Sequence, residues 1–361
     1  MSEEIFLMKG NEAIAHAAIR YGADGYFGYP ITPQSEILET LMNEAPWKTT
    51  GMIVLQAESE TASINMVYGG AGCGKAVMTS SSSPGMSLML EGVSYIAAGE
   101  LPCLLVNVMR GGPGLGTIQP SQADYFQAVK GGGHGDYKLI TLAPSSVQEM
   151  SDFVVLGFDL AFKYQTPVMI LTDGVIGQMM EKVKLPAYKR RRTDAEIREQ
   201  CPWATLGKPD SRKPNIITTL ELDSQKMEIN NLRLQAKYKK IENELCMHQE
   251  INCEDADYIL VAFGSAARLC QKAMELARAK GIKVGLIRPI TLWPFPSKEI
   301  DKYSSKIKGI LTVEMNAGQM VEDVRLSVNG KVRVEHYGRM GGIVPTPSEV
   351  VDALENKFGL E

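Results

Sequence analysis

Apolar residues along the first 183 positions follow two alternating patterns, one with helical spacing and one made of short continuous runs. Residues 10–21 and 144–162 repeat apolar side chains every three or four positions, which is typical of one face of a helix. Short apolar runs that indicate strands lie at residues 26–29, 51–56, 76–79, 104–109 and 168–172. Strands that alternate with helices are typical of a parallel sheet. We therefore predict a doubly wound, parallel-sheet α/β domain over residues 1–183.

The composition changes near residue 184 and the alternation returns after residue 255. The intervening segment holds a basic run at residues 189–192, a proline-rich irregular stretch, and apolar residues at helical spacing over residues 224–249. We predict a connector over residues 184–255 that packs on the domains or forms a subunit interface. The basic run is expected to be solvated surface. A second α/β domain is predicted over residues 256–361.

Glu60 is a candidate functional carboxylate at the start of an uncharged stretch. Residues 61–71 are small or apolar and no charge returns until Lys75, so we predict a helix without a polar face that is buried. Ile64 and Val67 share a helical face with Glu60. A carboxylate beside such a helix is costly to bury without a partner. The alternative is an exposed Glu60 in the first helical turn, where the helix dipole favours it.

Two loops follow predicted strands and hold residue types that suit a carboxylate ligand. Pro30 and Pro33 restrict the backbone around Thr32, although a plain turn has the same pattern. Arg110 ends the strand at residues 104–109 and precedes a glycine-rich loop. A guanidinium there is suited to bind a carboxylate bidentately, and the alternative is an arginine paired with a structural acid.

Three further motifs are weaker. The serine run ending at Ser83 precedes a predicted helix, where hydroxyls and free amides bind ligands or Ser83 serves as an N-cap. Residues 69–75 match most of a P-loop, but Ala76 replaces the hydroxyl residue and the helix precedes the strand, so an ATPase is disfavoured. His134 lies in a glycine loop and is interpreted as a loop residue, with a substrate-pocket donor as the alternative.

Composition narrows the function classes. Hydrophobic residues make up 44% and charged residues 22%, which is ordinary for a globular protein. A net charge of -4 gives no general attraction to nucleic acid or anionic membranes. No signal peptide or bilayer-length apolar run is recognised, so a cytoplasmic protein without membrane association is expected. The 6 cysteines show no C-x-x-C spacing, so we predict no iron–sulfur cluster and no metal site in this chain.

Three motifs together resemble a known family. G-Y-P-I-T-P at residues 28–33, the helix start Glu60-x-x-x-Ile64, and R-G-G-P at residues 110–113 occur in the order found in 2-oxoacid:ferredoxin oxidoreductase alpha subunits. The resemblance covers most of the chain and is nearest to the 2-oxoisovalerate (3-methyl-2-oxobutanoate, branched-chain) type, with the 2-oxoglutarate type next. It implies a pyrimidine-binding thiamine-diphosphate domain followed by a transketolase C-terminal-like α/β domain.

The resemblance also assigns roles to residues. Glu60 would hydrogen-bond the thiamine pyrimidine, and Arg110 and Thr32 would orient the substrate carboxylate. The residues expected to bind the cofactor are Tyr29, Pro30, Ile31, Thr32, Glu60, Ser82, Ser83, Pro84 and Gly85. The G-D-G motif that normally begins the magnesium and diphosphate site does not occur in the sequence. We therefore expect thiamine diphosphate to be shared with a partner subunit that supplies Mg²⁺.

The implied reaction is the coenzyme-A-dependent oxidative decarboxylation of a 2-oxoacid to acyl-CoA and CO₂, with electrons passed to ferredoxin. The implied partners are a beta-type subunit with the diphosphate-binding domain, a gamma-type subunit, and a ferredoxin-like subunit, with iron–sulfur clusters in partner subunits only. A 2-oxoglutarate enzyme should offer a second cation, and a branched-chain enzyme an apolar wall. The alternatives are a non-oxidative thiamine-dependent subunit and an assembly subunit that binds no cofactor.

Overall fold

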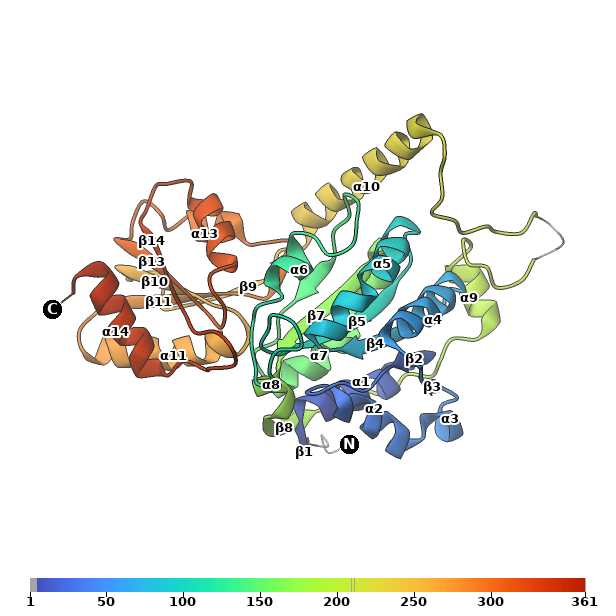
Figure 1. Ribbon diagram of the computed structural model, residues 1–361, viewed down its shortest axis with the longest axis horizontal. Helices are drawn as coiled ribbons and strands as arrows, with labels where there is room; N and C mark the ends of the chain where they lie inside the picture. The colour runs from blue at the N-terminus through green and yellow to red at the C-terminus, as the bar shows by residue number, and fades with distance from the viewer. Residues whose placement is uncertain (1–4, 209, 211, 361) are drawn as a thin grey trace.

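The first domain is built on a seven-stranded sheet (Figure 1) in the computed structural model, which describes residues 5–208, 210 and 212–360. The strand order is β12-β6-β7-β5-β4-β2-β3, and all neighbours are parallel except β12 with β6. The strands are β2 (Gly25–Gly28), β3 (Ile53–Gln56), β4 (Val77–Ser81), β5 (Cys103–Met109), β6 (Ile140–Leu142), β7 (Pro167–Asp173) and β12 (Thr291–Trp293). β12 comes from the second half of the chain, which thus completes one edge of the first sheet.

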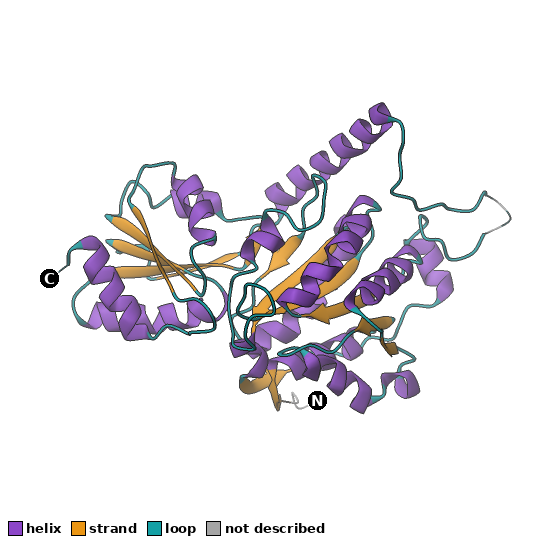
Figure 2. Ribbon diagram, in the orientation of Figure 1, coloured by secondary structure: helices purple, strands orange, loops and turns teal. Residues whose placement is uncertain are grey.

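Helices cover both faces of this sheet (Figure 2). α1, α2 and α7 pack together on one face, and α4 and α5 pack together on the other. The helices are α1 (Gly10–Tyr21), α2 (Ser35–Glu44), α3 (Pro46–Thr49), α4 (Glu60–Gly72), α5 (Ser83–Ala98), α6 (Tyr125–Val129), α7 (Val147–Tyr164) and α8 (Gly174–Gln178). The central strands β5 and β7 are buried along their whole length, as expected for a sheet covered on both faces.

The second domain is a smaller α/β unit with the sheet order β14-β13-β10-β11-β9. Its strands are β9 (His248–Ile251), β10 (Tyr258–Val261), β11 (Val284–Pro289), β13 (Gly309–Glu314) and β14 (Val334–Gly338). Its helices are α11 (Gly264–Ala279), α12 (Ser297–Asp301), α13 (Met320–Val328) and α14 (Pro347–Phe358). β9 is antiparallel to β11 and lies within the segment predicted as a connector. The division at residues 183 and 255 stays a prediction.

The remaining elements join or flank the domains. β1 (Ile5–Lys9) and β8 (Met180–Lys184) form an antiparallel pair below the first sheet. The connector holds α9 (Asp194–Gln200) and α10 (Ser224–Glu244), and the first part of α10 extends away from the body of the molecule (Figure 1). α10 is anchored by its later turns, where Leu234, Tyr238 and Ile241 are buried. Among the described helices, none is both long and apolar enough to cross a bilayer.

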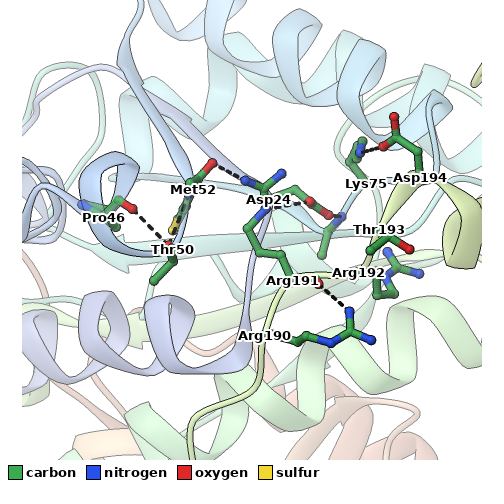
Figure 3. A network of polar contacts seen from close by, with 12 residues as sticks. Asp24, Pro46, Thr50, Met52, Lys75, Arg190, Arg191, Arg192, Thr193 and Asp194 are labelled. Atoms are coloured by element: carbon green, nitrogen blue, oxygen red, sulfur yellow. Dashed lines mark hydrogen bonds and ion pairs between the residues drawn. The ribbon is translucent and has the colours of Figure 1, made fainter.

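The basic run at residues 189–192 is solvated only in part: Lys189 and Arg190 are exposed, but Arg191 and Arg192 are half-buried, and the expectation is wrong for those two. Arg191 Nε lies 3.0 Å from Oδ1 of Asp24, whose side chain is only 4% exposed (Figure 3). Arg192 Nη2 donates to the carbonyl of Gly74 at 2.8 Å. Lys75, the apparent P-loop lysine, forms an ion pair with Asp194 at 2.7 Å. The run therefore fastens the connector to the first domain, and only Arg190 among these arginines is mostly exposed.

Buried polar contacts fix the two domains against each other. The backbone N–H of Gln122 donates to the Met315 carbonyl at 3.0 Å, and its Nε2 donates to the Phe263 carbonyl at 2.8 Å. Ser265 Oγ donates to Asp173 Oδ2 at 2.6 Å, and complete burial raises the pKa of Asp173. Because unpaired polar groups are costly inside a protein, these contacts specify one relative position of the domains.

Replacing Arg191 with alanine should destabilise the fold through Asp24. The substitution removes the cation beside a buried carboxylate, so the free energy of unfolding should fall by about 2 kcal/mol. Chemical denaturation monitored by circular dichroism measures this difference. Arg190→Ala is the matched control, because Arg190 is exposed and its loss should leave the transition midpoint unchanged. Equal midpoints for both variants would show that Arg191 does not hold the connector.

Candidate active site

Glu60 is a buried carboxylate without a partner inside the described part of the chain. It begins α4 after the N-cap Ser59, whose Oγ accepts a hydrogen bond from Ala62 N at 3.2 Å. The Glu60 side chain is 7% exposed, and no hydrogen bond among the described residues reaches its carboxylate. The alternative of an exposed glutamate in the first turn is therefore wrong. A buried carboxylate without a donor is unfavourable, so the geometry favours a ligand that supplies one.

Helix α4 is not buried on all sides, contrary to the sequence-based expectation. Ser63, Ile64 and Val67 are buried, whereas Thr61, Asn65, Met66 and Gly69 are exposed. Small uncharged side chains occur both in protein cores and on surfaces that another molecule covers. Composition alone therefore could not show whether α4 is buried in the core or has one face at an interface.

Gly85 lies against both the Glu60 carboxylate and the Ser81 hydroxyl. A Cβ atom at Gly85 would lie 2.5 Å from Glu60 Oε1 and 2.2 Å from Ser81 Oγ, so no side chain fits there. Ser81 and Ser82 are fully buried, and neither hydroxyl has a hydrogen-bond partner among the described residues. The free Ser81 hydroxyl near the free Glu60 carboxylate fits a flat polar ligand with both donors and acceptors, such as an aminopyrimidine ring.

A buried chain of hydrogen bonds supports the loop at residues 29–33. Tyr26 Oη lies 2.7 Å from Ser80 Oγ, and Ser80 Oγ donates to Gln34 Oε1 at 2.6 Å. Gln34 Nε2 in turn donates to the Tyr29 carbonyl at 2.9 Å. Burial raises the pKa of Tyr26, which keeps its hydroxyl protonated as the first donor of the chain. The loop therefore keeps a fixed conformation, with Thr32 exposed at its tip.

The structure brings Arg110 and Thr32 together. Arg110 Nη1 donates to the Thr32 carbonyl at 3.0 Å, and Nη2 donates to the Leu115 carbonyl at 2.9 Å. Arg110 Nε is buried and has no partner. No carboxylate pairs with this guanidinium within the described residues, so the structural-acid alternative is wrong. The positive charge is positioned by backbone carbonyls and remains available to an anionic ligand.

Asp124 belongs to the same site and was missed in the sequence. Ser83 Oγ accepts from Arg110 N at 3.1 Å and donates to Asp124 Oδ2 at 2.6 Å. Asn107 Nδ2 donates to the same oxygen at 2.9 Å. Burial raises the pKa of Asp124, although these two hydrogen bonds oppose that effect. Ser83 thus does not cap α5, whose N-cap is Ser82. Nothing in the sequence links Asp124 to Ser83, which lies in a different loop.

A cleft of about 420 Å³ lies between the domains, beside Arg110. Its lining residues are Ser83, Pro84, Ser87, Arg110, Gly112, Pro113, Gly114, Ser121, Ala123, Asp124, Asn316, Ala317, Gln319, Met340 and Gly341. Arg110 is the sole cationic side chain in this lining. Because Pro84 lines the cleft and Gly85 touches Glu60, the cleft and the Glu60 site adjoin.

His134 lies apart from these residues. It is exposed in the loop after α6 and lines a separate hollow beneath α10, together with Tyr95, Leu220 and Asn231. None of the predicted site residues lines that hollow. Its role stays open between the two interpretations.

The chain is similar to proteins of known activity over nearly its full length. Residues 16–247 match the family described as pyruvate flavodoxin/ferredoxin oxidoreductase, thiamine diP-bdg, and residues 256–350 match pyruvate:ferredoxin oxidoreductase core domain II. The ketoisovalerate oxidoreductase subunit VorB of Methanothermobacter thermautotrophicus is 46% identical, and the alignment covers 98% of each chain.

Solved structures show the same fold. A 2-oxoglutarate:ferredoxin oxidoreductase from Magnetococcus marinus, with 2-oxoglutarate, coenzyme A and succinyl-CoA bound, superimposes with a TM-score of 0.85 at 28% identity, covering 99% of this chain and 66% of that chain. A split-gene transketolase, at 13% identity and a TM-score of 0.61, covers 98% of this chain and 99% of its own, and shows the fold alone. The predicted thiamine-diphosphate-type fold with its transketolase-like second domain is confirmed. This chain belongs to the 2-oxoacid:ferredoxin oxidoreductase family, as its three motifs predicted, and is an oxidoreductase subunit with a thiamine-diphosphate-binding domain.

Proposed function

We propose that this chain is the alpha-type subunit of an oxidoreductase that converts 2-oxoisovalerate, coenzyme A and oxidised ferredoxin to acyl-CoA, CO₂ and reduced ferredoxin. The observation that carries the choice of substrate is the cleft beside Arg110, which offers one cation together with apolar surface from Pro113, Ala317 and Met340. The similarity to the ketoisovalerate subunit supports the same choice. 2-Oxoglutarate, the alternative substrate, has a second carboxylate for which this lining provides no cation.

The Glu60 site fits the pyrimidine ring of thiamine diphosphate. The cofactor, when bound, supplies the electron sink that makes decarboxylation of a 2-oxoacid feasible. Glu60 would hold a proton at a ring nitrogen, and the buried Ser81 and Ser82 hydroxyls would complete the polar contacts. Because Gly85 has no side chain, the space beside Glu60 and Ser81 at the start of α5 would remain open for the ring. The loop at residues 29–33 would lie beside the same site, because its supporting hydrogen bonds begin at Ser80, the neighbour of Ser81.

Arg110 and Thr32 would orient the substrate. Nη1 and Nη2 of Arg110 each donate to one backbone carbonyl, which leaves the second N–H of each nitrogen for a carboxylate oxygen. A charge held in this way needs little reorganisation when the 2-oxoacid binds. Pro113, Ala317 and Met340 then offer apolar surface to the branched end of the molecule.

The exposed face of α4 would receive the beta-type subunit that supplies Mg²⁺ and the diphosphate site. Met66 is 38% exposed, and Leu88 on the neighbouring α5 is 58% exposed. Ile53 and Leu55 on the edge strand β3 are 54% and 40% exposed. An apolar surface beside a half-built cofactor site is typical of a protein interface. The gamma-type and ferredoxin-like subunits would carry the iron–sulfur clusters, and the complex would work in the cytoplasm.

Replacing Glu60 with glutamine should nearly abolish turnover while the complex still assembles. Glutamine keeps the shape of the side chain but cannot exchange a proton with the ring, so kcat should fall by roughly 10²–10⁴-fold. Coenzyme-A-dependent viologen reduction measures turnover, and size-exclusion chromatography measures assembly. Glu58→Gln, two residues away and exposed, is the matched control. Wild-type turnover in Glu60→Gln would refute the assignment.

Replacing Gly85 with alanine should disturb the Glu60 site by steric overlap. The new Cβ atom would overlap Glu60 Oε1 and Ser81 Oγ, and a displacement of that size should lower turnover by roughly 10²-fold. Thiamine diphosphate retained by the purified complex should fall as well. Gly131→Ala is the control, because a Cβ there meets no atom within 4 Å. Equal cofactor content and turnover in the two variants would exclude Gly85 as part of the pyrimidine site.

The substrate is tested with the complete complex, purified anaerobically from a cell that expresses all its subunits. We expect viologen reduction with 2-oxoisovalerate to exceed that with 2-oxoglutarate by at least about tenfold in kcat/KM. The reverse preference would establish the 2-oxoglutarate alternative. A complex that contains thiamine diphosphate but reduces viologen with no 2-oxoacid would favour a non-oxidative enzyme.

A further inference from the structure

Two glycine-rich loops from different domains run directly against each other at the cleft. The first follows β5 and spans residues 111–119, and the second follows β14 and spans residues 339–343. A Cβ atom at Gly111 would lie 3.1 Å from Gly342 N, and one at Gly342 would lie 2.3 Å from the Gln119 Cβ. Gly342 also has a φ of 98°, which other residues rarely adopt. The second domain therefore helps to form the wall of the substrate cleft.

The second loop is held in place by its own domain. Arg339, at its start, forms an ion pair with Glu349 of α14, and its backbone N–H donates to the Glu314 carbonyl at 3.3 Å. Ile343 N donates to the Met340 carbonyl at 3.4 Å, which closes a turn. Met340 is the first residue of this turn, so the two contacts hold its side chain in a defined place.

Met340 is well suited to contact an apolar substrate group. Its side chain lines the cleft that Arg110 also lines, yet it remains 60% exposed. A methionine exposed to this extent in a cleft has no packing role that explains it. Its unbranched thioether adapts to an apolar ligand. The remaining charged group of the lining is the acid Asp124, which offers nothing to a second carboxylate.

We propose that Met340, on the Arg339–Ile343 loop of the second domain, contacts the side chain of the 2-oxoacid and selects branched apolar substrates over dicarboxylates. This inference rests on the proposed function and deepens it. The carboxylate of the substrate would lie at Arg110, and its far end would lie against Met340 across the cleft. Specificity would thus be determined by the second domain, while the chemistry is determined by the first.

The test replaces Met340 in the complete complex and compares substrates. Met340→Arg places a cation at the far end of the cleft. The ratio of kcat/KM for 2-oxoglutarate to that for 2-oxoisovalerate should therefore rise by at least about tenfold, mainly through KM. Met340→Leu, which keeps an apolar wall, should retain the preference for 2-oxoisovalerate. Met180→Arg on β8 is the matched control, since Met180 is 56% exposed and lies outside the cleft.

A second variant keeps the inference testable if Met340→Arg does not assemble. Met340→Ala should raise KM for 2-oxoisovalerate several-fold and change kcat little, because it removes contact with the substrate without touching Arg110 or Glu60. An unchanged ratio in Met340→Arg, or an unchanged KM in Met340→Ala, would overturn the role of Met340. A wild-type complex that is inactive with every 2-oxoacid would instead refute the proposed function, and this inference with it.

Discussion

The burial of an unpaired carboxylate is the constraint on which the first domain depends. A glutamate that loses water without gaining a donor destabilises a fold, so the surrounding packing must hold it in place. Helices α4 and α5 do so by close approach: a Cβ atom at Gly92 would lie 2.5 Å from Ile64 Cγ2, one turn after Glu60. The glycines of α5 therefore bring the two helices close enough to keep the carboxylate at the mouth of the site. The unpaired Glu60 carboxylate lowers the stability of the unliganded protein, and a ligand that donates a hydrogen bond to it would restore that stability.

A second set of contacts keeps the positive group near this negative one. Arg110 is held by backbone carbonyls, and Ser83 links its strand to Asp124. Both the carboxylate and the guanidinium are positioned at the carboxyl ends of parallel strands, the edge at which open α/β sheets bind ligands. Because the supporting contacts come from β4, β5 and the loop at residues 29–33, the site depends on the pairing of the whole central sheet.

Local patterns in the sequence predicted most of the architecture. The bounds of α1 coincide with the predicted range, because a clear helical period ends there at Gly22. β12 was missed, since three residues carry no period and their partner β6 lies far away in the sequence. The same reason explains the basic run, whose Arg191 pairs with Asp24 from the start of the chain. Pairings between residues far apart in the chain produce no local sequence pattern from which they could be predicted.

The candidate residues came from motifs, and only their arrangement came from the structure. Glu60, Thr32 and Arg110 were recognised by resemblance, whereas Asp124 and Met340 lie in stretches without a motif. Their cleft is formed by two loops that fit only because glycine stands at positions 111 and 342. The two domains therefore have to match each other at these loops. A chimera that joined this first domain to the second domain of a relative would keep the fold of each part, but it would need both loops from one parent to keep a functional cleft.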